Sequence, residues 1–435
     1  MRKIYFVFLF CISVSLQAQI YQPIDTILID KQALFQHFSQ KSEKLEDKLK
    51  SFPVKNRKLI RDFSKNRKEV IAELTQDNYL ITDDELVVYL NSLLDNIKEQ
   101  NNISDPNLEI FLTRDTDPNA YSLGDGSLVF NLSLLNRLEN EEELYSIMGH
   151  EVAHYLLDHL EVEFEHKMRV TTSKEYKKET KKIRRSRFNR FSKQIENFKE
   201  HQYGNSSERR KRELEADSLS IVLTEKIIKN PNNRVSALQK VDSILPSEIV
   251  RIDLNKLKTH FSTSTIPFND EWTSGYDFSK YHYQDGKVDI FGVHKDSLRS
   301  HPETKERIAK IKEATKNMQV KPHAEQDGFT ALKEKIRLED VYAHYCLEEY
   351  GQGIYLILQL QSFPEVNQKE QAFYNHMLSL FNKKLHIARQ KFQFKKYVDE
   401  PDERNLSEEY NLFLTILDNL NPSELLALSN KYQNL

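Results

Sequence analysis

Two histidines four residues apart, with a glutamate next to the first, constrain the fold of this chain more than any other feature. On a helix, His150 and His154 project from one face toward a single point, and Glu151 lies beside that point. Asn140 is a suitable N-cap, and the three glutamates after it suit the positive end of a helix. The pattern therefore predicts a helix whose two imidazoles hold a zinc ion.

The opposite side of this helix can be buried. Four apolar residues lie together away from the two histidines: Leu144, Met148, Val152 and Tyr155. A helix that packs on one side and binds a metal on the other needs a folded domain around it. The alternative interpretation of so short a pattern is a surface helix that carries two ordinary histidines.

A catalytic zinc site needs a third protein ligand and one open position. The candidate is Glu213, on a second helix predicted over residues 206–230 and stopped by Pro231. Asp217 lies one turn beyond Glu213 on the same face, where its carboxylate can hydrogen-bond a ligand imidazole. Glu215 is the alternative third ligand, and it faces away from Asp217.

The first residues of the chain predict export. Residues 1–19 join a basic start to an apolar run and a polar end, which is the pattern of a secretory signal peptide, with cleavage near Ala18. We therefore expect an exported, periplasmic protein. Beyond that segment Cys346 is the only cysteine, so the exported chain forms no internal disulfide. With 39% hydrophobic and 30% charged residues, the composition is that of a soluble globular protein of two or three domains.

The chain after the signal peptide divides into three predicted parts. Residues 20–80 are polar and favour helix, residues 81–318 form the main domain, and residues 319–435 are helical to the end. The C-terminal helices indicate either a tetratricopeptide-like hairpin or a plain helical bundle.

The main domain contains two predicted strands, over residues 108–113 and 127–132. A turn, Gly124-Asp125-Gly126, precedes the second strand. The residues between the two strands suit an edge strand, whose unpaired backbone groups can bind an extended peptide. The expected substrate-binding residues are Asn119, Ala120 and Tyr121, followed by Ser122.

A basic insertion, residues 166–212, interrupts the main domain. It holds 17 Lys or Arg against 5 Asp or Glu. One interpretation is a solvated helical insertion or mobile flap, and the other is a surface for acidic lipids or an acidic partner. The net charge of -3 and the lack of a nucleic-acid-binding signature predict no nucleic-acid partner.

Five motifs in a fixed order together resemble one enzyme family. They are Asn119-Ala120-Tyr121-Ser122, Gly124-Asp125-Gly126, Gly149-His150-Glu151-Val152-Ala153-His154, Glu213-Leu214-Glu215-Ala216-Asp217, and His301-Pro302 followed by Arg307-Ile308. The chain resembles the gluzincin family of the CAAX prenyl protease and the heat-shock protease HtpX. It is similar to the soluble, exported branch, some of whose members carry helical repeats after the peptidase domain. The resemblance covers about residues 83–317 and departs from the family pattern in the basic insertion and at Asp125.

The resemblance implies an α+β, zincin-like metallopeptidase domain followed by an all-helical domain. It also implies one zinc ion per chain and a role for each matched residue. His150, His154 and Glu213 would be the ligands, Glu151 the catalytic base, Asp217 the hydrogen-bond partner of a ligand, and His159 a packing or hydrogen-bonding residue. His301 would either donate a hydrogen bond during catalysis or occupy the open zinc position in a resting state; otherwise it is a surface or helix-capping histidine.

The expected function is a zinc metalloendopeptidase of protein quality control, which hydrolyses peptide bonds of unfolded or misassembled exported proteins. The alternative is a chaperone-like or binding protein with a closed or structural zinc site. Glu151 favours the enzyme, because a structural site does not need a base. The expected partners are polypeptide substrates, with a membrane surface or protein assembly reached through the basic insertion or the C-terminal helices.

Overall fold

The computed structural model describes the chain in separate ranges. These are residues 21–24, 30–53, 55–82, 85–174, 176–178, 190–242, 252, 254–273, 304–320, 328–363, 366–402 and 406–433, with the backbone alone for 190–206 and 242. The predicted signal peptide, the middle of the basic insertion and His301 lie outside the described residues. No helix within these ranges is both long and apolar enough to cross a membrane.

A mixed four-stranded sheet lies at the centre of the main domain. Its strand order is β1-β2-β4-β3, with β2 and β4 parallel and the two outer pairs antiparallel. The strands are β1 (Leu80–Ile81), β2 (Glu109–Thr113), β3 (Ala120–Ser122) and β4 (Ser127–Asn131). β3 therefore forms one edge of the sheet, and the predicted edge strand is confirmed.

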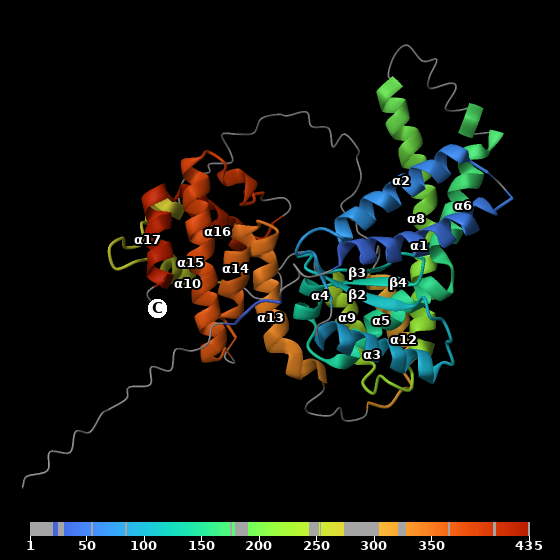
Figure 1. Cartoon of the computed structure of the whole chain (residues 1–435), viewed down its shortest axis with the longest axis horizontal. Coiled ribbons are helices and arrows are strands. Elements are labelled where there is room, and N and C mark those ends of the chain that lie inside the picture. The colour runs from blue at the N-terminus through green and yellow to red at the C-terminus, as the bar shows by residue number, and fades with distance from the viewer. Residues whose placement is uncertain are drawn as a thin grey trace, which may run out of the picture.

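Helices cover both faces of this sheet. Alternate strand residues such as Leu112 and Phe130 pack on α3 and α5 (Glu141–Leu156), whereas Phe111 and Val129 pack on α1 and α2. Figure 1 shows the strands between α1 and α2 on one side and α3 and α5 on the other. The first three helices are α1 (Lys31–Lys50), α2 (Arg57–Leu74) and α3 (Glu85–Gln100). The N-terminal helical segment is thus one layer of the domain.

The metal motif lies on α5, which packs against α8 and α9. α12 packs in turn against α8 and α9, so these helices surround the motif. Their bounds are α4 (Leu132–Arg137), α5 (Glu141–Leu156), α6 (His159–Thr172), α8 (Arg190–Leu223), α9 (Asn232–Asp242) and α12 (Thr304–Thr315). The fold of the main domain is α+β, as predicted.

The second predicted helix differs in its bounds from the expectation of residues 206–230. α8 begins earlier, at Arg190, so the polar residues before 206 are also part of the helix. It ends at Leu223, where the chain enters a turn closed by a hydrogen bond from the Ile227 N–H to the Thr224 carbonyl. Pro231 therefore comes after the helix end and does not cause it.

The C-terminal helices pack around a second core, which includes Phe373, Phe381 and Phe413. Their bounds are α13 (Gly328–Cys346), α14 (Tyr350–Leu360), α15 (Gln368–Gln390), the short η3 (Phe394–Lys396), α16 (Glu408–Asn419) and α17 (Pro422–Gln433). Two earlier elements, α10 (Leu254–Phe261) and η2 (Asp270–Thr273), also join this core. Residues within the predicted main domain therefore complete the helical part.

Helix α13 connects the two parts of the molecule, and Figure 1 shows it between them. It packs against α4 of the main domain and against α14 and α15. On α13, Glu339 forms a fully buried ion pair with Arg114, with 2.9 Å between the two charged groups. Tyr21 and the Ile24 N–H also donate to the Glu339 carboxylate. Removal of one partner from such a buried pair leaves an uncompensated charge, so this contact fixes α13 on the main domain.

A buried histidine makes the C-terminal helices sensitive to acid. His260 on α10 stacks on Tyr432 and contacts the tyrosine hydroxyl at 2.7 Å. Burial, and to a smaller extent Lys431, lower the pKa of His260 to about 3. The native state therefore keeps this imidazole neutral, while the unfolded chain binds a proton below its ordinary pKa of about 6.5.

We expect the helical part to lose stability as the pH falls below about 6.5, by up to about 1.4 kcal/mol per pH unit until the folded pKa is reached. His260→Gln removes the titrating group, so its melting temperature should fall less between pH 7 and pH 5 than that of the wild type. The exposed His376 provides the control, since His376→Gln should keep the wild-type pH dependence. Equal pH dependence in the wild type and His260→Gln would contradict the role of His260.

Candidate metal centre

Helix α5 begins with the predicted cap and also uses its acidic first turn in the fold. The Asn140 side chain accepts a hydrogen bond from the Glu143 N–H at 3.0 Å. Glu143 is buried and binds Lys240 and Ser236 of α9. Glu142 accepts from the backbone N–H groups of Lys229 and Asn230, just before α9. The first turn therefore fixes α9 beside the motif as well as balancing the helix dipole.

The two motif histidines and one glutamate of α8 meet at a single point. The Nε2 atoms of His150 and His154 are 3.0 Å apart, and the Glu213 carboxylate lies 3.5 Å from the first and 3.6 Å from the second. Ligands at about 2.0–2.1 Å from zinc in tetrahedral geometry are separated by about 3.3 Å. The three side chains therefore fit one zinc ion, and they form the one metal-binding group of this kind among the described residues.

Each imidazole has a partner for its other nitrogen. His150 Nδ1 lies 3.0 Å from the Asp217 carboxylate, and His154 Nδ1 lies 2.9 Å from Nδ1 of His159. Proton donation from these Nδ1 atoms leaves both Nε2 lone pairs directed at the metal position. His159 therefore has the hydrogen-bonding role expected for it.

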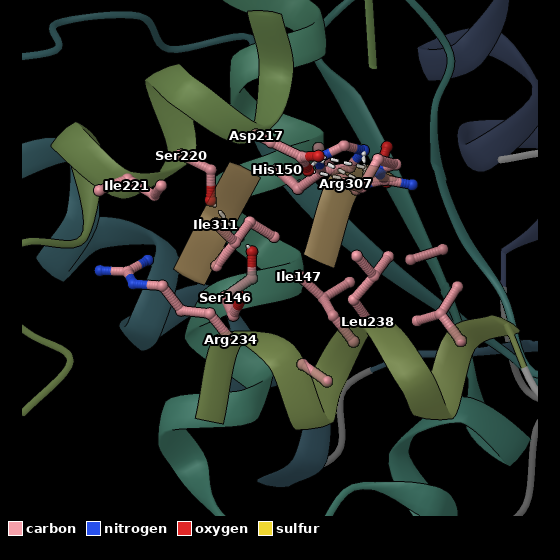
Figure 2. A pocket seen from close by; sticks show the side chains of 14 residues that line it. Ser146, Ile147, His150, Asp217, Ser220, Ile221, Arg234, Leu238, Arg307 and Ile311 are labelled. Carbon is pink, nitrogen blue, oxygen red and sulfur yellow. Dashed lines mark hydrogen bonds and ion pairs between the residues drawn. The ribbon is translucent and has the colours of Figure 1, made fainter. Parts of the chain in front are cut away.

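Arg307 of α12 is a member of the site for which the sequence indicated no role beyond the motif match. It is buried, its Nε and Nη2 donate to the two oxygens of Asp217 at 2.8 and 2.7 Å, and its Nη1 lies 3.2 Å from Glu213. Figure 2 shows Arg307, Asp217 and His150 side by side at one end of a small cavity. The bidentate contact orients the carboxylate that in turn orients His150.

The charges of the centre suit a cation. Burial lowers the pKa of His150, but its contacts with Asp217 and Glu213 outweigh this and raise that pKa to about 9. Burial would raise the pKa of Asp217, but hydrogen bonds from Arg307 and His150 hold it well below the ordinary value. The carboxylates of Asp217 and Glu213 thus lie next to Nδ1 and Nε2 of His150, and a metal ion can replace the proton on Nε2.

The structure separates the two candidates for the third ligand. Glu213 is buried in the cluster, whereas Glu215 is exposed, lies 3.6 Å from Nε2 of His159 and pairs with Lys211. The two residues differ because positions two apart on a helix point about 200° from each other.

An open cleft of about 560 Å³ leads to the metal position. Glu151, His154 and Glu213 line it, and so do all three expected substrate-binding residues, Asn119, Ala120 and Tyr121. At the two ends of the β3–β4 pair, the backbone groups of Asn119 and Leu123 form the hydrogen bonds between the strands. By strand alternation, the backbone groups of Ala120 and Ser122 point to the open edge of the sheet.

A second cavity, of about 40 Å³, lies behind Glu151. Its walls include the aliphatic side chains of Ile147, Leu238 and Ile311, as Figure 2 shows. Glu151 lines both this cavity and the open cleft, so its buried carboxylate lies between them.

Asp125, the departure from the family pattern in the turn before β4, has a structural partner. Its carboxylate forms a buried ion pair with Arg67 of α2 and accepts from the Ser127 N–H at 3.0 Å. Arg67 also donates to the Leu123 carbonyl at 3.0 Å. This turn is therefore held by a helix from the N-terminal segment.

We expect Arg67→Met to destabilise the main domain by about 3 kcal/mol, because it leaves the Asp125 carboxylate buried without its cation. The double change Arg67→Met with Asp125→Asn removes the uncompensated charge and should recover part of that loss. Urea unfolding measures both variants. If the single and double variants are equally unstable, packing of the Arg67 stem accounts for the loss and the ion pair does not.

The family comparison agrees with this geometry. Residues 87–315, more than half of the 435-residue chain, match the sequence model of peptidase family M48. The match contains α5, α8 and α12 and ends before α13, while α1 and α2 lie outside it. No curated protein matches the chain. M48 peptidases are zinc-dependent, and the chain belongs to peptidase family M48, the gluzincin zinc metallopeptidases.

Proposed function

We propose that this metalloprotease is an endopeptidase that cuts unfolded polypeptide in an extended conformation, with zinc held by His150, His154 and Glu213. The observation that carries the proposal is that members of this cluster and the edge strand β3 line the same cleft. When bound, zinc supplies a Lewis acid that polarises the scissile carbonyl and lowers the pKa of a water molecule to about 7.

The residues around the cluster have distinct roles in this proposal. Glu151 takes the proton of the attacking water and passes it to the leaving amine. Asp217, oriented by Arg307, keeps His150 in the tautomer whose Nε2 faces the metal. His159 does the same for His154.

The edge strand favours extended substrates. A peptide that pairs with Ala120 and Ser122 presents its backbone next to Glu151, since these residues line the same cleft. A folded protein has few exposed segments free to pair in this way, whereas an unfolded chain has many. This supports unfolded or misassembled polypeptides as substrates.

The place of action is inferred from the sequence. The pattern of residues 1–19 supports export to the periplasm, where misassembled exported proteins are available as substrates. The charge of the basic insertion supports binding to an acidic membrane surface or protein assembly. The pairing of α13 with α14 and of α14 with α15 is consistent with tetratricopeptide-like hairpins that bind a protein partner.

The test gives the peptidase one substrate protein in two states, unfolded and folded. Reduced, carboxymethylated lactalbumin is unfolded, and the native disulfide-bonded form is folded. The mature chain with one equivalent of zinc should cut the unfolded form into several fragments, leave the native form largely intact and lose activity with a chelator. Equal cleavage of both forms would overturn the preference for unfolded chains, and zinc-loaded protein that cuts neither would overturn the endopeptidase proposal.

A further inference from the structure

Helix α2 contributes to the cleft although it lies outside the family match. Its Phe63 lines the cavity that also contains Glu151 and His154. Leu160 and Phe164 of α6 line the same cavity. These three side chains form an apolar patch in a cleft whose other walls are the metal ligands and the edge strand.

The patch is part of a packed cluster and has a defined shape. The rings of Phe63 and Phe164 meet edge to face, with centroids 5.2 Å apart. Phe164 is buried against Leu45 and Leu49 of α1, whereas Phe63 and Leu160 are only partly buried. The buried members hold the patch in place, and the partly buried ones present apolar surface to the cleft.

The position of Phe63 is fixed by the residue one helical turn further along α2. Arg67 shares a face of the helix with Phe63. It is anchored by Asp125 and by the Leu123 carbonyl in the turn that joins β3 to β4. Phe63 is therefore held at a constant place relative to β3, the strand proposed to pair with substrate.

Three of the charged residues that line the cleft beside the patch are paired with each other: Glu163, Lys167 and Arg212. Glu163 accepts from Lys167, with 2.6 Å between the charged groups, and lies 3.3 Å from Arg212. A charged substrate side chain would have to compete with these pairs. A large apolar side chain would only have to displace water from Phe63 and Leu160, which is favourable.

We propose that Phe63, with Leu160 and Phe164, forms a specificity subsite for an aromatic or large aliphatic side chain of the substrate. The N-terminal helices are then part of the substrate-binding cleft. This inference rests on the proposed endopeptidase function, because the subsite matters only if a peptide occupies the cleft.

The experiment compares cleavage-site preferences. Wild type, Phe63→Ala, Phe63→Leu and Phe63→Trp digest reduced, carboxymethylated lactalbumin, and mass spectrometry identifies the sites. In the wild type, one position relative to the cut should be enriched in Phe, Tyr, Leu and Met. Two quenched peptides that differ only there, with Phe or Ala, then give kcat/KM. Phe63→Ala should lower kcat/KM for the Phe peptide about tenfold more than kcat/KM for the Ala peptide, a typical size for lost contacts in an apolar pocket.

Further variants separate specificity from folding. Phe63→Leu keeps an apolar side chain and should retain most of the preference, and Phe63→Trp should shift it toward smaller residues by filling the subsite. Phe35→Ala removes an exposed phenylalanine of α1 and should leave the profile unchanged. A wild-type profile from Phe63→Ala, or from Phe63→Trp if the alanine variant fails to fold, would overturn the subsite. Absence of cleavage by the wild type would instead overturn the proposed function.

Discussion

Glu151→Gln should abolish nearly all peptidase activity while zinc content stays near one ion per chain. The substitution keeps the size of the side chain but removes the proton acceptor, and general-base catalysis contributes about 10²- to 10⁴-fold. Glu151 is buried and lines both the open cleft and the small cavity, so the substitution acts at the site itself. The measurements are kcat/KM on a quenched peptide and zinc content by atomic absorption.

The exposed Glu99 of α3 provides a matched control for this change. Glu99→Gln makes the same chemical substitution away from the cleft and should have wild-type activity. A Glu151→Gln protein that retains zinc and cleaves at the wild-type rate would remove Glu151 from the mechanism. If zinc is lost together with activity, Glu151 has a structural role in the centre.

Glu213→Gln should weaken zinc binding by more than about 100-fold, because it replaces a charged ligand within the cluster. Asp217→Asn leaves all three ligands in place and should weaken zinc binding about 10- to 100-fold, which is typical for a residue that orients a ligand. Competition with a fluorescent zinc chelator measures both affinities at the same pH.

Glu215→Gln is the sharpest control for Glu213→Gln, since it alters the same helix two residues away. Its side chain is exposed and lies outside the cluster, so zinc affinity should stay within about twofold of the wild type. Loss of affinity in Glu215→Gln with retention in Glu213→Gln would reverse the assignment of the third ligand.

Local periodicity made several features predictable from the sequence. The N-cap Asn140, the apolar side of α5 and the positions of His150 and His154 follow from the helical repeat, which needs no knowledge of distant residues. The same holds for the strands that became β2, β3 and β4, since alternation and turn residues mark them within a few positions. The proposed role of His301 in a resting state stays a prediction, because that residue lies outside the described ranges.

The sequence by itself determined the metal motif, its helix and the two candidates for a third ligand, because these depend on spacing along one element. Only the tertiary structure decided that Glu213 and not Glu215 meets the histidines, since the rotation of α8 against α5 selects one face of α8. It also decided that Arg307 secures Asp217 and that the N-terminal helices cover the sheet and hold its turn through Arg67. The two charge contacts join residues 58 and 90 positions apart, and buried charges find their partners through packing that no local pattern specifies.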